Sequence, residues 1–256
     1  MLRFKSLGSG SSGNATLVEV TGLAPVRLLV DCGLGLKQLS MRLTQAGLAD
    51  QSIDALFITH EHGDHIGCAR QFARRFRTPV WMSRGTYEAI GSPDFDGLLH
   101  IARDGEAINL GGLQLMPFTV PHDAREPLQL TCTDGAGKLG ILTDLGHATT
   151  HLLAHVARCD ALLLECNHDS ALLTESSYPP FLKRRVGGLL GHLSNSAAAD
   201  IARSVLHSGL KQLVAAHLSE QNNRPDLARE ALSAALGTGT EVVIADASAG
   251  TRWLAV

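Results

Sequence analysis

The sequence of 256 residues lacks several features that would define its class at once. Its five cysteines are an odd number and form no Cys-x-x-Cys pair, which argues against a disulfide framework and excludes a zinc-ribbon motif. It has no run of 18 apolar residues that could span a membrane, and no long apolar segment at the N-terminus of the kind that signal peptides contain. We therefore expect a cytoplasmic protein without a membrane partner.

The sequence also has little excess charge. Its formal net charge is −3, and charged residues make up 18% of it. No diffuse basic field would attract nucleic acid, so any such binding must depend on local basic patches. Hydrophobic residues make up 45%, an ordinary value for a globular chain that is long enough to bury a substantial core.

The strongest positive signal is a dense group of potential metal ligands directly after the apolar run 55–58. It reads His-x-His-x-Asp-His and contains His60, His62, Asp64 and His65. Imidazole and carboxylate groups suit zinc, iron or manganese. The spacing is too short for one helix face to present all four side chains, whereas a turn after a strand can direct them to two adjacent metal positions. We expect Glu61, between the first two histidines, to face solvent.

Short apolar runs elsewhere in the chain also end at polar residues. The runs are 27–30, 55–59, 115–121, 139–143, 161–164 and 212–216. The residues that end them are Asp31, His60, His122, Asp144, Glu165 and His217. Continuous apolar runs of this length are typical of buried strands. Polar residues at their ends would converge on one edge of a layered sheet, where loops carry function.

Apolar residues spaced three and four apart predict helices between these strands. The expected helices are Leu36–Ala46, Ile66–Phe76, Ala148–Ala157, Ser196–His207 and Pro225–Leu236. Glycine-containing turns at 111–112 and 134–137 predict hairpins. No linker or low-complexity boundary interrupts the pattern. We therefore expect a single domain over residues 1–256, of the α/β class, with two mixed β-sheets between outer helices.

The motif and the residues that follow it resemble the metallo-β-lactamase-fold hydrolases over essentially the whole chain. His60-x-His62-x-Asp64-His65 matches the signature of that superfamily, and its later ligand motifs are matched in order by His122, Asp144 and His217. The resemblance implies a four-layer αββα sandwich and two divalent metal ions, zinc or manganese, with iron as a further candidate. One ion would be held by His60, His62 and His122, the other by Asp64, His65 and His217, and Asp144 would bridge both. Asp31 would orient a ligand.

Four further segments resemble the YycJ/WalJ group of bacterial proteins, which is associated with 5′-to-3′ exonuclease activity on DNA. They are residues 8–14, 121–127, 164–169 and 216–223. The function that this implies is a two-metal phosphodiesterase acting on nucleic acid, favouring a 5′-to-3′ DNA exonuclease. Two adjacent ions lower the pKa of a shared water, which attacks as a bridging hydroxide. The catalytic set is Asp64 with Glu165 and His192, because the last two resemble the Glu/His pair of ribonuclease Z, which can protonate a leaving oxygen.

Several residues are candidates for binding substrate. Ser11 and Asn14 lie in a Gly/Ser-rich loop that can bring backbone N–H groups close to an anion, although a plain tight turn is the competing interpretation. Lys183 and Arg184 can hold a backbone phosphate, and His168 is a further candidate for phosphate contact. We interpret the histidines at 147, 151 and 155, spaced four apart, as structural.

Two other functions use the same ligands. A small-molecule hydrolase of lactones or thioesters, as in glyoxalase II, would share the metals without needing Glu165 and His192. A non-catalytic metal-binding adaptor is less compatible with a complete set of seven ligand positions. The sequence leaves the oligomeric state open.

Overall fold

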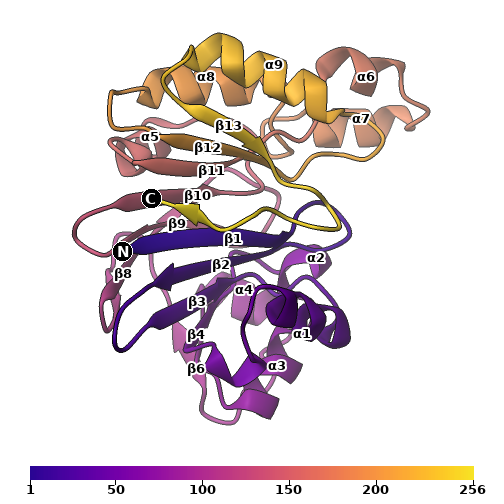
Figure 1. Ribbon diagram of the computed structural model, residues 1–256. Helices are drawn as coiled ribbons and strands as arrows, with labels where there is room; N and C mark the ends of the chain where they lie inside the picture. Colours follow the sequence, from indigo (N-terminus) through magenta and orange to yellow (C-terminus); the bar gives the residue numbers. More distant parts are fainter.

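Two seven-stranded β-sheets lie face to face in the computed structural model, which describes residues 1–256 (Figure 1). In pairing order, the strands of the first sheet are β14 (Leu254–Ala255), β1 (Leu2–Gly8), β2 (Ala15–Val20), β3 (Val26–Val30), β4 (Ala55–Phe57), β5 (Val80–Met82) and β6 (Leu99–Ile101). Those of the second are β13 (Glu241–Ile244), β12 (Gln212–Ala216), β11 (Ala161–Glu165), β10 (Lys138–Leu142), β9 (Leu128–Thr133), β8 (Leu113–Thr119) and β7 (Ile108–Leu110).

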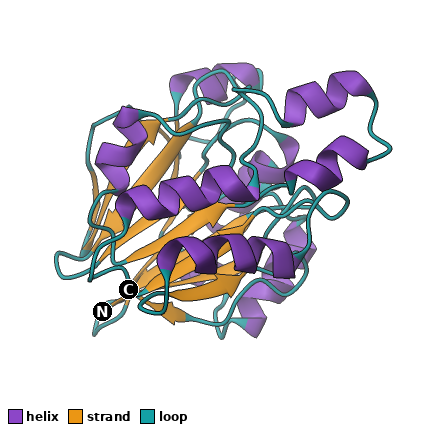
Figure 2. Ribbon diagram, turned by 90° about the horizontal axis from the view of Figure 1, so that it is seen from above, coloured by secondary structure: helices purple, strands orange, loops and turns teal.

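Helices cover the outer face of each sheet, so that the molecule has four layers. The first sheet is covered by α1 (Leu36–Gln45), α2 (Gly63–Ile66), α3 (Ala69–Phe76) and α4 (Arg84–Ala89), with the short 3-10 helix η1 (Asp50–Ser52) between them. The second is covered by α5 (Thr150–Val156), α8 (Asn195–Val205) and α9 (Pro225–Leu236). Two more helices, α6 (Ser170–Glu175) and α7 (Pro180–Val186), project beyond the sheets (Figures 1 and 2). None of these helices has the length and hydropathy that a membrane-spanning segment needs.

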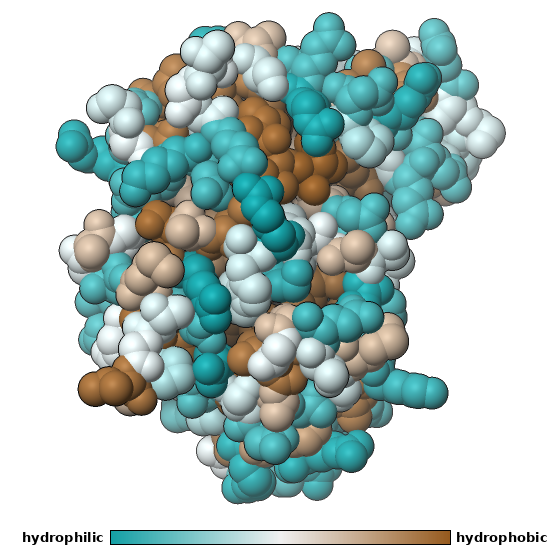
Figure 3. Space-filling model, in the orientation of Figure 1, coloured by the Kyte–Doolittle hydropathy of each residue, from teal (hydrophilic) through white to brown (hydrophobic).

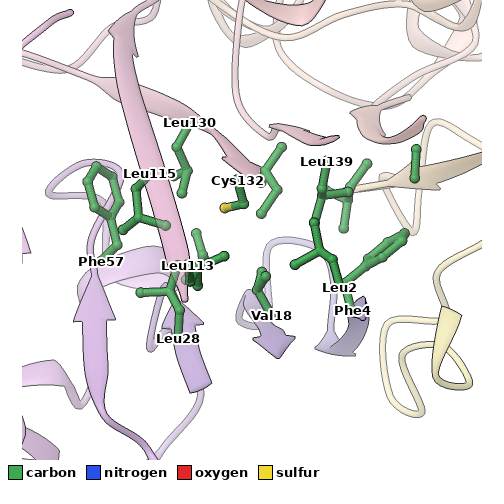
Figure 4. Packing of buried hydrophobic residues seen from close by; sticks show 14 of the residues in the cluster. Leu2, Phe4, Val18, Leu28, Phe57, Leu113, Leu115, Leu130, Cys132 and Leu139 are labelled. Carbon is green, nitrogen blue, oxygen red and sulfur yellow. The ribbon is translucent and has the colours of Figure 1, made fainter. Parts of the chain in front are cut away.

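Apolar side chains alternate between the layers along each central strand. In β3, Leu28 and Val30 face the core between the sheets, while Leu29 faces the helices. In β11, Leu163 faces the central core and Leu162 the helices. Because both faces of the sheet are covered, the sequence of such a strand is a continuous apolar run. Figure 4 shows the central core, where truncation of a buried leucine to alanine would cost about 2–5 kcal/mol.

The directions of the strands place one set of ends together. Strands β3 to β6 are parallel, as are β10 to β13. Strands β1 and β8 run the same way as β3 and β10, because one antiparallel strand separates each pair. The carboxyl ends of these strands therefore share one edge of the sandwich, which is where ligand sites form in sheets of this kind.

The structure confirms the predicted fold class, and it corrects one of the predicted helices. The helix expected over Ile66–Phe76 is broken at Gly67, whose φ is 26°, and α3 begins only at Ala69. A Cβ at position 67 would lie 2.4 Å from the carbonyl oxygen of Cys32, so the chain must turn there without a side chain. The sequence analysis also missed α4, α6, α7, β5 and β6, which are too short to show a period.

The side of the molecule drawn in Figure 3 is mainly hydrophilic, with apolar surface gathered between α9 and β13. A pocket of about 380 Å³ lies at the end of β13 and includes Leu218, Pro225 and Ile244 in its wall. Ser9 also lines it, which places the pocket next to the Gly/Ser-rich loop after β1. The pocket therefore opens beside the edge at which the strand ends meet.

Candidate metal centre

The first group of potential ligands consists of His60, His62, His122 and Asp144. One ligand atom from each lies within 4.8 Å of the others. His62 Nδ1 is 3.0 Å from His60 Nε2 and 3.2 Å from His122 Nε2. Asp144 Oδ2 is 3.6 Å and 3.7 Å from the same two Nε2 atoms. Three imidazole nitrogens and one carboxylate oxygen thus converge on one point from β4, β8 and β10.

The second group shares Asp144 with the first. Its members are Asp64, His65, His217 and Asp144, again within 4.8 Å of one another. His65 Nε2 lies 3.1 Å from Asp144 Oδ2 and 3.7 Å from Asp64 Oδ2, and His217 Nε2 lies 3.4 Å from Asp64 Oδ2. The structure therefore brings together the two sets that the resemblance implied, with Asp144 between them.

The donor atoms fit divalent cations. The nitrogens of His60 and His62 face each other at 3.0 Å, an arrangement suited to lone pairs that share a positive ion. Burial lowers the pKa of His60 and of His122, which favours the neutral form that binds metal. Oδ1 of the buried Asp144 lies 2.8 Å from His217 Nδ1, and its Oδ2 faces the nitrogens of both groups. The two groups are compatible with a binuclear divalent metal site.

The second group attracts positive charge more strongly. Burial alone would lower the pKa of His65, but the carboxylates of Asp144 and Asp31 raise it to about 10. Burial also opposes the protonation of His217. The carboxylates of Asp144, Asp64 and Glu165 nevertheless raise the pKa of His217 well above its ordinary value. Protons and metal ions would compete for these nitrogens.

Asp31 and Thr59 contact the histidines of the metal motif on the side away from the metal groups' shared Asp144 oxygen, through the Nδ1 atoms. His65 Nδ1 donates to Asp31 Oδ2 at 2.7 Å, and the Thr59 backbone N–H donates to Asp31 Oδ1 at 2.8 Å. Thr59 Oγ1 also lies 3.0 Å from His60 Nδ1. Asp31 adopts a φ of 63°, a strained value for a residue with a side chain. Asp31 thus contacts a ligand as the resemblance implied, whereas the contribution of Thr59 was not predicted.

The Gly/Ser-rich loop packs against the second group. Ser9 Oγ accepts a hydrogen bond from the backbone of His217 at 2.7 Å. The buried Asn14 amide donates to the Asp64 carbonyl oxygen at 3.2 Å and lies 3.1 Å from His65 Nε2. Ser11 is exposed. This placement favours a positioning role for Asn14, and it leaves Ser11 free to meet a ligand from solvent.

Glu165 connects His192 with His217 of the second group. His192 Nδ1 donates to Glu165 Oε1 at 2.7 Å, and His217 Nδ1 lies 3.1 Å from the same oxygen. Burial would raise the pKa of Glu165, but His192 lowers it to about 2. Burial would lower the pKa of His192, and Glu165 raises it by more. The His192 ring lies 5.4 Å from that of His122 and 5.3 Å from that of His217, measured between centroids.

The remaining predicted substrate-binding residues form no hydrogen bond with the side chains of the two metal groups. His168 is buried, and its Nδ1 has no hydrogen-bond partner. Lys183 Nζ donates to the Thr174 carbonyl oxygen at 2.6 Å, which ties α7 to α6. Arg184 is exposed. Neither Lys183 nor Arg184 forms a hydrogen bond with a residue of the two metal groups.

The sequence analysis did not predict that Asp123 and Arg185 meet next to the site. Asp123 Oδ1 lies 3.4 Å from His122 Nε2, and Arg185 Nε donates to Asp123 Oδ2 at 2.6 Å. Asp123 follows His122 directly and lies in the segment 121–127 that resembles the YycJ/WalJ group, but neither signal predicts a contact with Arg185. Glu61, which we expected to face solvent, is partly exposed, and its Oε1 accepts a 2.7 Å hydrogen bond from the Arg125 backbone.

The histidine stripe lies apart from this centre. His151 Nε2 donates to Asp104 at 3.0 Å, and the two form an exposed group with His155. His155 stacks on Phe118 with 4.6 Å between ring centroids, which agrees with the structural interpretation.

Comparisons with known proteins agree with this geometry. The family model described as the metallo-beta-lactamase superfamily matches residues 8–162. Exodeoxyribonuclease WalJ of Streptococcus pneumoniae is 31% identical, with 97% of this chain and 95% of the relative covered. Exodeoxyribonuclease YycJ of Bacillus anthracis is 34% identical, with 92% of this chain and 89% of the relative covered.

The fold is similar to that of the metallo-beta-lactamase fold protein YhfI from Bacillus subtilis. The TM-score is 0.75 at 19% identity, and the match covers 99% of this chain and 98% of that one. The chain therefore belongs to the metallo-beta-lactamase superfamily of metal-dependent hydrolases and, within it, to the WalJ/YycJ group.

Proposed function

We propose that this protein is a two-metal-dependent nuclease that degrades DNA as a 5′-to-3′ exonuclease. The names of the two relatives that match nearly the whole chain support this proposal. Two divalent cations, zinc or manganese with iron as a further candidate, would be held by the two groups that share Asp144. When bound, they would activate a water and stabilise negative charge on the phosphodiester.

The observation that carries the proposal is the place of His192 beside both groups. Its Nδ1 is engaged by Glu165, so its other ring nitrogen is free to face a substrate. The side chain is 20% exposed, which leaves that nitrogen accessible from the site. The raised pKa keeps a proton available near neutral pH. His192 would donate this proton to the leaving 3′ oxygen, with Glu165 holding the ring in place.

The other side chains of the site would bind and orient the substrate. Asp64 is the exception, since it would bind metal: its side chain is 23% exposed and lies 3.7 Å from His65 Nε2 and 3.4 Å from His217 Nε2. Ser11 and His168 are candidates for contact with a phosphate. Lys183 and Arg184 in α7 would hold the backbone of the strand as it approaches.

A comparison of substrates tests this function directly. Purified protein loaded with manganese or zinc would be given 5′-phosphorylated single- and double-stranded DNA, RNA, a lactone and a thioester. We expect degradation of DNA, with a label at the 3′ end retained on progressively shorter products. Rapid lactone or thioester turnover without DNA cleavage would contradict the proposal and favour a small-molecule hydrolase. If the protein cleaved RNA in preference to DNA, RNA would become the proposed substrate.

A further inference from the structure

Two adjacent leucines stand exposed on the loop that joins α7 to His192. The Leu189 side chain is 74% exposed and that of Leu190 is 53% exposed. Phe181, in α7, is 66% exposed. Single apolar side chains on a surface are ordinary, but a group of large ones beside a catalytic site indicates a surface that something covers.

Hydrogen bonds fix the backbone of this loop in its exposed position. The Leu189 carbonyl oxygen accepts from His147 Nδ1 at 2.8 Å, and the Leu190 carbonyl oxygen accepts from the Asp123 backbone at 2.9 Å. A Cβ at Gly146 would lie 2.1 Å from the Leu189 carbonyl oxygen, so the two segments are in close contact. The backbone that carries the two leucines is therefore held in place.

The loop forms part of the rim of the metal centre. The carbonyl oxygen of Gly191 accepts from His122 Nδ1 at 3.1 Å, so the residue after Leu190 contacts a member of the first metal group. His192 follows directly in the chain. Figure 1 shows α7 on the same side of the molecule as α2, which contains Asp64 and His65. The two leucines thus lie two and three positions before His192 on the same loop.

The charge around the leucines indicates what covers them. Residues 178–191 contain Lys183, Arg184 and Arg185 and no acidic residue, in a chain whose net charge is −3. Arg185 is paired with Asp123 and Lys183 with the Thr174 carbonyl oxygen, which leaves the exposed Arg184 to complement a partner that carries negative charge next to an apolar face. A nucleotide has both, because its phosphate is an anion and its base presents a flat apolar surface.

We propose that Leu189 and Leu190 form the seat for the base of the terminal nucleotide, next to the phosphodiester that is cleaved. This inference rests on the proposed nuclease function and specifies how its substrate is held. Leucine side chains offer no hydrogen-bond donor or acceptor, so the seat contacts every base in the same way. The enzyme would thus proceed along a strand without regard to sequence.

The test compares a normal 5′-phosphorylated strand with one whose terminal nucleotide is abasic. For the wild-type protein, kcat/KM should fall about tenfold on the abasic strand. The double variant Leu189→Ala/Leu190→Ala should lose a similar factor on the normal strand and no longer distinguish the two. Its hydrolysis of bis-p-nitrophenyl phosphate, which carries no nucleobase, should fall by a smaller factor. Leu23→Ala, at a side chain exposed in the turn between β2 and β3, is the matched control and should behave as wild type.

Each contrary result has a distinct meaning. Wild-type protein that degrades both strands at equal rates would overturn the seat and leave the nuclease function standing, and this arm requires no variant to fold. Absence of any DNA cleavage, with turnover of a lactone, would overturn the nuclease function itself. A double variant that changes from dimer to monomer in sedimentation, with unchanged kinetics on DNA, would assign the leucines to a contact between two copies of the chain and overturn the seat.

Discussion

Arg185 donates a 2.6 Å hydrogen bond to Asp123 across 62 positions of the sequence. The bond connects the basic helix α7 with the residue that follows His122. It also neutralises the charge of the Asp123 carboxylate, whose other oxygen lies 3.4 Å from His122 Nε2. The pair is partly exposed, so its contribution to the free energy of unfolding should be no more than about 1 kcal/mol. The loss of this ion pair should therefore change the affinity for substrate more than the stability of the fold.

We expect Arg185→Ala to raise KM for DNA, because an unbalanced Asp123 would repel the approaching phosphate. Asp123→Asn should lower KM, and the double variant should return toward wild type. Steady-state kinetics on a 5′-phosphorylated strand measure all three, with thermal unfolding as the control for stability. A double variant as weak as Arg185→Ala would show instead that Arg185 contacts the phosphate itself.

The shared position of Asp144 predicts a distinctive loss of metal. Wild-type protein should bind close to two ions per chain, and Asp144→Ala should weaken both sites. His122→Ala should weaken chiefly the first site, and His217→Ala the second. Metal analysis after dialysis, together with calorimetric titration, measures the stoichiometry. A single ion at saturation, with Asp144→Ala without effect, would contradict the bridging arrangement.

The two sites should also differ in how many protons metal binding releases. The pKa of His60 and of His122 is lowered, so these rings are already neutral near pH 7. The pKa of His65 is raised to about 10 and that of His217 is raised as well, so both must lose a proton to bind metal. Affinity at the second site should therefore fall first as the pH is lowered. Calorimetry in buffers of different ionisation enthalpy counts the protons, and equal release at both sites would contradict this.

The metal groups were predictable because their residues follow strands that the sequence reveals. The runs before His60, Asp144 and His217 are continuous and apolar, and parallel strands bring their carboxyl ends to one edge. Composition and spacing placed the strands, and the family resemblance divided the ligands between two ions. The long helices α1, α8 and α9 were predicted for the same reason, since each has a full amphipathic period.

The rest of the site depends on contacts that leave no local pattern. Arg185 meets Asp123 only because α7, a helix of seven residues without a visible period, lies against the loop after β8. Glu61 is held by the backbone of Arg125, 64 positions away. Asn14 contacts Asp64 and His65 because the loops carrying them pack closely, as Gly33 shows: a Cβ there would lie 1.7 Å from the Asp64 carbonyl oxygen.

His192→Ala should separate proton transfer from metal binding. His192 belongs to neither of the two groups assigned to the ions, although it forms a third group of potential ligands with Asp144, Glu165 and His217. The variant should therefore retain both ions, and its turnover of DNA should fall by about 10²–10⁴-fold. Hydrolysis of bis-p-nitrophenyl phosphate should fall much less, because its leaving group needs no proton. Rapid-quench kinetics on both substrates, with metal analysis, measure the difference. Equal losses on the two substrates would argue against proton donation, and loss of metal would make His192 a ligand.

Arg184→Ala should weaken DNA binding in a way that depends on salt. Arg184 is exposed and forms no ion pair within the chain, so its loss should remove about one phosphate contact without disturbing the fold. The slope of log affinity against log salt should become less steep by about one. Lys183→Ala removes a similar charge but also the hydrogen bond to Thr174, so it should loosen α7 as well. Lys211→Ala, at an exposed lysine in another part of the chain, is the matched control. Fluorescence anisotropy at several salt concentrations gives these slopes, and an unchanged slope for Arg184→Ala would place this arginine outside the DNA path.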